Sequence, residues 1–137
     1  MKSRTYINLF CLLLSIGLFF SCEELLEELF DDPFMTAGTE VITSQPFVGS
    51  EHVVFEGEVR NLPPDMQVEY GFMWFPANEE DPEMNRVVVG RRTTNGSFQS
   101  TMMTLPRGEN LVVCAYITEM RDNYELIGDE RDFSWGF

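Results

Sequence analysis

Short runs of β-branched and aromatic residues, separated by turn-forming residues, fill the chain from residue 39 to its end. Apolar and polar side chains alternate within several of these runs, which is typical of strands with one face toward a core. No part of this region sustains a helical period. The pattern predicts an all-β domain with seven strands at 39–44, 52–60, 68–75, 86–89, 98–104, 111–118 and 124–135, the last broken at Gly128.

The same alternation predicts which side chains face the core. In the run 52–60, Glu56, Glu58 and Arg60 share one side, so the apolar side chains between them must share the other. Applied to three of the runs, the rule gives an inward set of Val53, Phe55, Gly57, Val59, Val68, Tyr70, Phe72, Trp74, Leu111, Val113, Ala115 and Ile117. Between two other runs, Asn95-Gly96 is a strong hairpin signal because both residues tolerate positive φ.

The start of the chain has the pattern of a secretory signal. Lys2 and Arg4 precede an apolar run at 9–20, which has the length of a signal h-region and is shorter than the ~20 residues of a membrane-spanning helix. Cys22 follows at once, and this boundary resembles the lipobox of bacterial lipoproteins. The resemblance implies a signal peptide at 1–21 and attachment of lipid to the thiol of Cys22. An uncleaved anchor with a membrane-buried cysteine is the alternative.

An acidic segment follows the cysteine. Glu23 and Glu24 resemble the export signal that sends lipoproteins to the outer face of the outer membrane in one group of Gram-negative bacteria. A plain solvated linker is the alternative, and so is a short amphipathic helix carrying Leu25, Leu26, Leu29 and Phe30 on one face. We expect residues 22–38 to form an acidic tether and residues 39–137 to form one domain.

The net charge limits the kinds of partner that the chain can bind, and the cysteine count limits its disulfides. The whole chain has a net charge of −14, and loss of Lys2 and Arg4 with the signal makes it −16. Such an acidic chain is a poor binder of nucleic acid, because phosphate contacts need clustered Lys and Arg. Cys114 would be the single cysteine left once Cys22 carries lipid, so no disulfide is expected inside the domain.

The strand region resembles fibronectin type III-like, or immunoglobulin-like, domains. The residues that carry the resemblance lie between Val68 and Trp135 and are Tyr70-Gly71-Phe72-Met73-Trp74, Gly96-Ser97-Phe98, Leu105-Pro106, Ala115-Tyr116-Ile117, Gly128 and Asp132-Phe133-Ser134. The resemblance implies a seven-stranded Greek-key sandwich with three strands packed on four. Leu111 stands where the family usually has a tyrosine that closes a corner, so that hydrogen bond is missing here.

Residues suited to catalysis or to holding a cofactor or metal are scarce. His52 is the single histidine, and nucleophile–base catalysis generally needs one. Acidic residues gather at 79–83 and 122–132, but no calcium-loop spacing occurs, so a solvated acidic loop is favoured over a metal site. We expect no enzyme activity, no cofactor and no metal.

The outward faces of two runs suggest a binding surface. If the inward set is correct, Met73, Phe75, Val112, Cys114 and Tyr116 point away from the core, and neighbouring strands would join them into an apolar stripe. Exposed apolar patches mark contact surfaces. The stripe is either a partner-binding face or is covered by the tether or a long loop.

Taken together, the sequence predicts a lipid-anchored protein of the outer membrane that faces the cell exterior. Its β-sandwich would act as a non-catalytic protein-binding, adhesion or scaffold module. The alternative is an accessory glycan-binding subunit of a surface polysaccharide-capture system, in which an exposed aromatic ring would stack on sugar.

Overall fold

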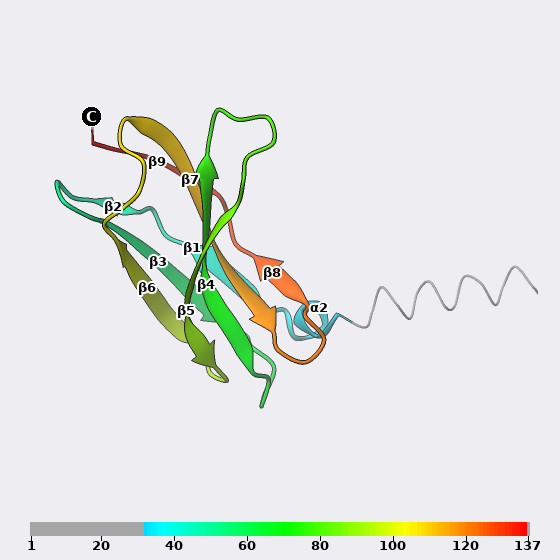
Figure 1. Ribbon diagram of the computed structural model, residues 1–137. Helices are drawn as coiled ribbons and strands as arrows, with labels where there is room; N and C mark the ends of the chain where they lie inside the picture. The colour runs from blue at the N-terminus through cyan, green and yellow to red at the C-terminus, as the bar shows by residue number, and fades with distance from the viewer. Residues whose placement is uncertain (1–31, 137) are drawn as a thin grey trace, which may run out of the picture.

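The computed structural model describes residues 32–136, which form a β-sandwich of two antiparallel sheets preceded by one short helix (Figure 1). The signal peptide, Cys22, Glu23 and Glu24 lie outside the described residues. The elements are α2 (Pro33–Ala37), β1 (Glu40–Thr43), β2 (Phe47–Val48), β3 (Val53–Arg60), β4 (Val68–Pro76), β5 (Asn85–Arg92), β6 (Gly96–Met102), β7 (Glu109–Glu119), β8 (Glu125–Ile127) and β9 (Arg131–Trp135). No helix within residues 32–136 is long and apolar enough to cross a membrane.

The predicted sandwich is confirmed, with nine strands in the described residues instead of seven. In the first sheet, β6 pairs with one edge of β3, and the short strands β1 and β2 share its other edge. In the second sheet, β4 lies between β5 and β7, and β8 and β9 share the far edge of β7. The extra strands come from β2, which the sequence pattern missed, and from the break at Gly128. The sheets contain four and five strands, and because β1 with β2 and β8 with β9 each share one edge, they have three and four strand positions.

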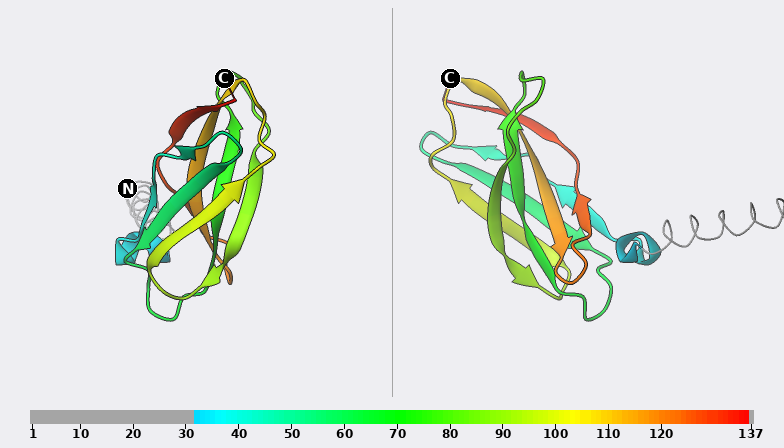
Figure 2. Two further views of the ribbon diagram at one scale, coloured as in Figure 1. Left: turned by 90° about the vertical axis from the view of Figure 1, so that its left-hand side faces the viewer. Right: turned by 45° about the vertical axis from the view of Figure 1, so that its right-hand side comes forward.

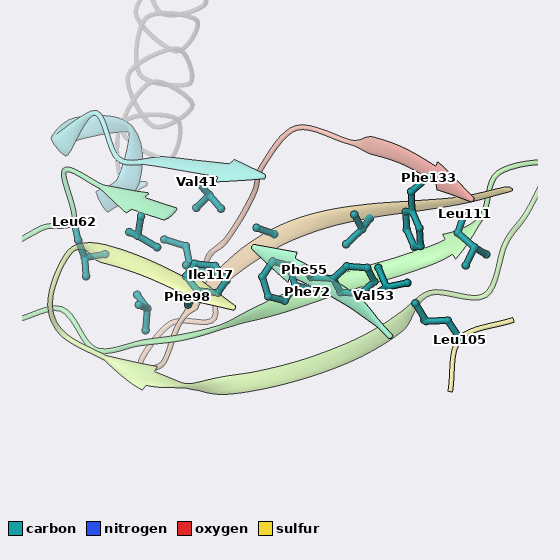
Figure 3. Close-up of a cluster of buried hydrophobic side chains, with 14 of the residues drawn as sticks. Val41, Val53, Phe55, Leu62, Phe72, Phe98, Leu105, Leu111, Ile117 and Phe133 are labelled. Atoms are coloured by element: carbon teal, nitrogen blue, oxygen red, sulfur yellow. The ribbon is translucent and has the colours of Figure 1, made fainter. Parts of the chain in front are cut away.

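The core lies between the two sheets, and the predicted inward side chains form it (Figure 3). Val53, Phe55 and Val59 of β3 are completely buried, and so are Leu111 and Ile117 of β7. Tyr70 and Trp74 pack against this cluster while remaining half-buried. The alternation rule therefore assigned the strand faces correctly.

Helix α2 belongs to the domain although its residues were assigned to the tether. Asp32 caps the helix by accepting a hydrogen bond from the Phe34 backbone nitrogen at 2.9 Å, and Gly38 ends it in the left-handed conformation with φ of 65°. The Phe34 side chain is only 2% exposed and joins the core cluster. The fold thus includes residues before 39.

Hydrogen bonds join the two sheets along one side of the sandwich. The Thr43 hydroxyl accepts a bond from the Ala115 backbone nitrogen at 2.9 Å, and the Arg131 side chain donates to the Thr43 carbonyl, also at 2.9 Å. On the opposite side, β5 and β6 are the outermost strands of their sheets (Figure 2). Asn95-Gly96 connects these two strands, but they lie in different sheets, so the expected hairpin is wrong.

Candidate functional site

The predicted stripe lies on the outward face of the second sheet. Met73 and Cys114 are paired across β4 and β7, and Met73, Cys114 and Tyr116 form a cluster separate from the core. Of the two possibilities left open by the sequence, an exposed face or a covered one, the burial favours the second: Met73, Val112, Cys114 and Tyr116 are each at most 5% exposed, and Phe75 is half-buried. The stripe is therefore outward-facing but covered.

An ion pair spans the sheet on the side of the stripe. Arg86 on β5 and Glu125 on β8 make a bidentate pair with both N–O distances at 3.0 Å. These strands lie at the two edges of the four-position sheet, so the paired side chains reach across β4 and β7. Because Arg86 also lies over the Tyr116 ring, the sheet itself supplies cover for this residue of the stripe.

Tyr116 lies at the centre of this covered face. The Arg86 guanidinium carbon lies 4.9 Å from the centre of the Tyr116 ring, a cation–π geometry, and the Tyr116 hydroxyl donates to a Glu69 carboxylate oxygen at 3.4 Å. Burial raises the pKa of the Tyr116 phenol, and the nearby Glu69 carboxylate adds to the rise. The hydrogen bond with Glu125 raises the pKa of Arg86, so the covering charge is retained.

Cys114 has the environment of a structural thiol. It is 2% exposed, and its sulfur donates a weak hydrogen bond to the Met73 carbonyl at 3.8 Å. Burial, followed by the charges of Glu130 and Glu125, raises the pKa of the Cys114 thiol to about 11. Because the thiolate is the reactive form, this cysteine is a poor nucleophile and a poor metal ligand at neutral pH.

One edge of the same sheet remains open. Strand β5 pairs with β4 on one side only, and no described strand pairs with its other side. Val88, in the middle of β5, is 57% exposed, although valine favours half-buried positions in strands. An open strand edge offers unpaired backbone N–H and C=O groups to another chain.

The β5 edge is also basic. Arg86, Arg91 and Arg92 all belong to this strand, while the chain as a whole carries a net charge of −14. Arg92 lies 4.1 Å from the centre of the Tyr70 ring and donates to the Ser97 carbonyl at 3.2 Å. Among residues 32–136 the two ion pairs use Arg60 and Arg86, so the charges of Arg91 and Arg92 have no carboxylate partner there.

Two other places were candidates for a catalytic, metal or ligand-binding site. His52 is half-buried near Phe47, with ring centres 6.3 Å apart, and no group of three or more His, Cys, Asp or Glu in residues 32–136 could hold a metal ion. A surface hollow of about 540 Å³ lies at the α2 end, lined by Pro33, Pro64 and Glu119 among others. Its Glu119 carboxylate accepts hydrogen bonds from the backbone nitrogens of Arg121 and Asp122, so it holds a turn in place.

Sequence reasoning found the stripe but missed its cover and the open edge. The cover depends on Arg86 and Glu125, which are far apart in sequence and meet only through the sheet order. The edge had a readable signal, because Arg91-Arg92 follows the run Val87–Val89 after a single glycine. Charged residues at the end of an apolar strand are typical of edge strands.

Comparisons with known proteins bear on the fold. No protein-family model and no curated protein matches the chain. Two solved structures of the sensor domain of the anti-sigma factor RsgI4 from Pseudobacteroides cellulosolvens are similar in fold. A short form of that domain superposes with a TM-score of 0.54 at 9% identity, covering 72% of this chain and 96% of that one. The solution structure gives a TM-score of 0.52 at 8% identity, covering 72% of this chain and 75% of that one.

Proposed function

We propose that this protein is a lipid-anchored, non-catalytic module of the outer membrane that binds another protein at the cell exterior. The observation that carries the proposal is the open edge of β5, an eight-residue strand with an exposed valine and arginines that lack carboxylate partners in the described part of the chain. Such an edge is a recurring site of protein recognition.

The anchor rests on the sequence of the N-terminal region. Cys22 would carry the lipid, and Glu23 and Glu24 would direct the protein to the outer face. The arrangement of the domain suits this placement, since α2 and the C-terminal end of β9 lie at opposite ends of the sandwich (Figure 1). A chain tethered at the α2 end would leave the long edge of β5 free along its side.

Catalysis is a poorer explanation of the site. The groups best suited to chemistry are engaged in structure, since Cys114 is buried with a raised pKa and Tyr116 is completely buried. The fold similarity to a sensor domain is in keeping with a binding role, because a β-sandwich supports binding through its edges and loops without chemistry of its own.

Glycan binding is the second candidate and has less support. Stacking on sugar needs an exposed aromatic ring, and the tryptophans and tyrosines of residues 32–136 are buried or half-buried. Phe47 is the large exposed aromatic side chain in this part of the chain, at 64% exposure. Retention on a polysaccharide that Phe47→Ala abolishes would favour the glycan alternative.

The anchor is tested by metabolic labelling with a fatty-acid analogue. Wild-type protein should be labelled and Cys22→Ala should not, because the thiol is the attachment site. Protease treatment of intact cells should then release the wild-type domain. Protection in intact cells but not in lysed cells would contradict exposure at the cell surface.

The binding role is tested by purifying the full chain from detergent-solubilised membranes after chemical crosslinking. We expect a second protein to co-purify in a fixed ratio to the chain. Elution of the mature chain alone at every crosslinker concentration would contradict a protein-binding function.

A further inference from the structure

We propose that the open edge of β5 docks an extended acidic segment of the partner protein, which adds to the second sheet as a further strand beside β5. The inference rests on the proposed function and names the chemistry of the partner at that site. It follows from the backbone geometry of the edge, from the pattern of side chains along it and from the charge of the rest of the chain.

The backbone of β5 is long enough to recognise a peptide. Its eight residues, of which Val89 is bulged out of register with β4, span at most roughly 26 Å at about 3.3 Å per residue. Alternate residues of an edge strand direct their N–H and C=O groups away from the sheet, and an added strand pairs with them. These main-chain bonds would supply affinity, while the side chains flanking them would supply selectivity.

The side chains on the outward face of β5 follow a basic–apolar–basic pattern. Arg86 is opposite Met73, Val88 is opposite Gly71 and Arg91 is opposite Glu69, so all three point to the outward face. A strand added beside β5 would place its own side chains next to these. Because Arg86 is already paired with Glu125, the matching segment carries an apolar residue beside Val88 and an acidic residue beside Arg91.

Charge complementarity selects an acidic partner over a second copy of this chain. Two antiparallel copies of β5 paired about their centres would bring Arg91 of one copy opposite Arg86 of the other, and β5 contains no carboxylate that could pair with Arg91. The edge strand of the other sheet lacks this signal, since its exposed side chains are the uncharged Ser97, Gln99 and Thr101. The basic pattern is particular to β5.

The docking site is tested by fluorescence anisotropy with the full chain in detergent and a dye-labelled peptide that carries glutamate, valine and glutamate at successive positions of one strand face, with threonine between them. We expect saturable binding that weakens at high salt, because the ion pairs at the edge are screened. The same peptide with lysine in place of glutamate should not bind. Failure of the acidic peptide to bind at millimolar concentration would overturn the proposal.

Paired variants keep this test specific to β5. Val88→Glu and Arg91→Glu should each weaken binding of the acidic peptide by tenfold or more. Ile127→Glu is the matched control, because Ile127 is 49% exposed at the opposite edge of the same sheet. Equal affinity of the Val88→Glu and Ile127→Glu variants would overturn the proposal. The melting temperature of each variant, compared with that of wild type, shows whether it is folded.

Other occupants give distinct results. A concentration-dependent dimer that Val88→Glu abolishes would replace the partner with a second copy of this chain and overturn the proposal. Peptide binding that appears only after deletion of residues 23–31 would mean that the chain's own acidic segment occupies the edge. That result would also overturn the proposal. A membrane partner that still co-purifies with Arg91→Glu would overturn the β5 site while leaving the proposed function intact.

Discussion

Removal of Arg86 should expose the covered face of the second sheet. Arg86 pairs with Glu125 and lies over the Tyr116 ring, while its aliphatic stem crosses apolar surface. Arg86→Ala deletes the ion pair, the cation–π contact and the cover together. Glu125→Gln deletes the ion pair and leaves the arginine in place, so the two variants separate the cover from the charge.

The expected loss of stability follows from the solvent exposure of the Arg86–Glu125 ion pair. The Arg86 and Glu125 side chains are 46% and 30% exposed, so solvent screens the ion pair and it should contribute only about 0.5 kcal/mol. The cation–π contact adds about 0.5–1 kcal/mol. Arg86→Ala should therefore lower the free energy of unfolding by about 1–2 kcal/mol, which is about 5–10 °C in melting temperature for a domain of this size. Glu125→Gln should cost about half a kilocalorie per mole.

Two measurements check this expectation. Thermal unfolding followed by circular dichroism gives the stability of each variant, and the reaction of Cys114 with a thiol reagent reports access to the covered face. Arg86→Ala should speed the Cys114 reaction, and Glu125→Gln should speed it less. Arg60→Ala is the control, because it breaks the other ion pair, with Glu58 in the other sheet, and should leave the Cys114 reaction unchanged. Wild-type stability together with unchanged Cys114 reactivity in Arg86→Ala would refute the covering role.

Four further predictions follow from particular residues. Phe34→Ala should destabilise the domain by about 3–5 kcal/mol, whereas Met35→Ala, at a side chain 75% exposed, should be near neutral; equal denaturant midpoints would show that α2 is not part of the core. Gly71→Ala should cost about 2–3 kcal/mol by chemical denaturation, because the added methyl would meet the Val87 carbonyl oxygen, and wild-type stability would contradict the packing of β4 on β5. The pKa of the Cys114 thiol is raised from 9.0 to about 11, so the stability linked to the protonated thiol is fully present below pH 9 and is lost as pH rises through 11. Cys114→Ala should make the melting temperature fall less steeply over this range in a pH series of melts. Amine-reactive biotinylation should miss the mature chain, since Lys2 is the one lysine in the sequence, and efficient labelling of the processed protein would argue against loss of the signal peptide or for a free amine on Cys22.

The strand faces could be predicted because the period of two is a local property. Val53, Phe55 and Val59 alternate with charged residues, and burying the charged set would cost far more than burying the apolar one. The exposure of an outward face is not local. Tyr116 is covered because Arg86 and Glu125 meet across two intervening strands, and no sequence spacing encodes that meeting.

The Asn95-Gly96 motif indicated a turn but not the sheets to which the flanking strands belong. Asn95-Gly96 does reverse the chain, with Gly96 at φ of 143° and the Asn95 side-chain oxygen accepting a hydrogen bond from the Leu62 backbone nitrogen at 2.8 Å. The strands that it joins belong to different sheets, because β5 pairs with β4 and β6 pairs with β3, both of which come earlier in the chain. The inclusion of Phe34 in the core was hidden for a related reason, since a five-residue helix is too short to show a periodic pattern.

Site-specific photo-crosslinking in intact membranes tests the central claim most directly. A photoreactive residue at position 88, on the open β5 edge, should form a covalent adduct with one partner protein, and the same residue at position 127, at the opposite edge of the sheet, should not. Identification of the crosslinked peptide should show an acidic, extended segment of that partner. Adducts of equal yield from both positions, or no protein adduct from either, would contradict an account in which this domain binds a protein through β5.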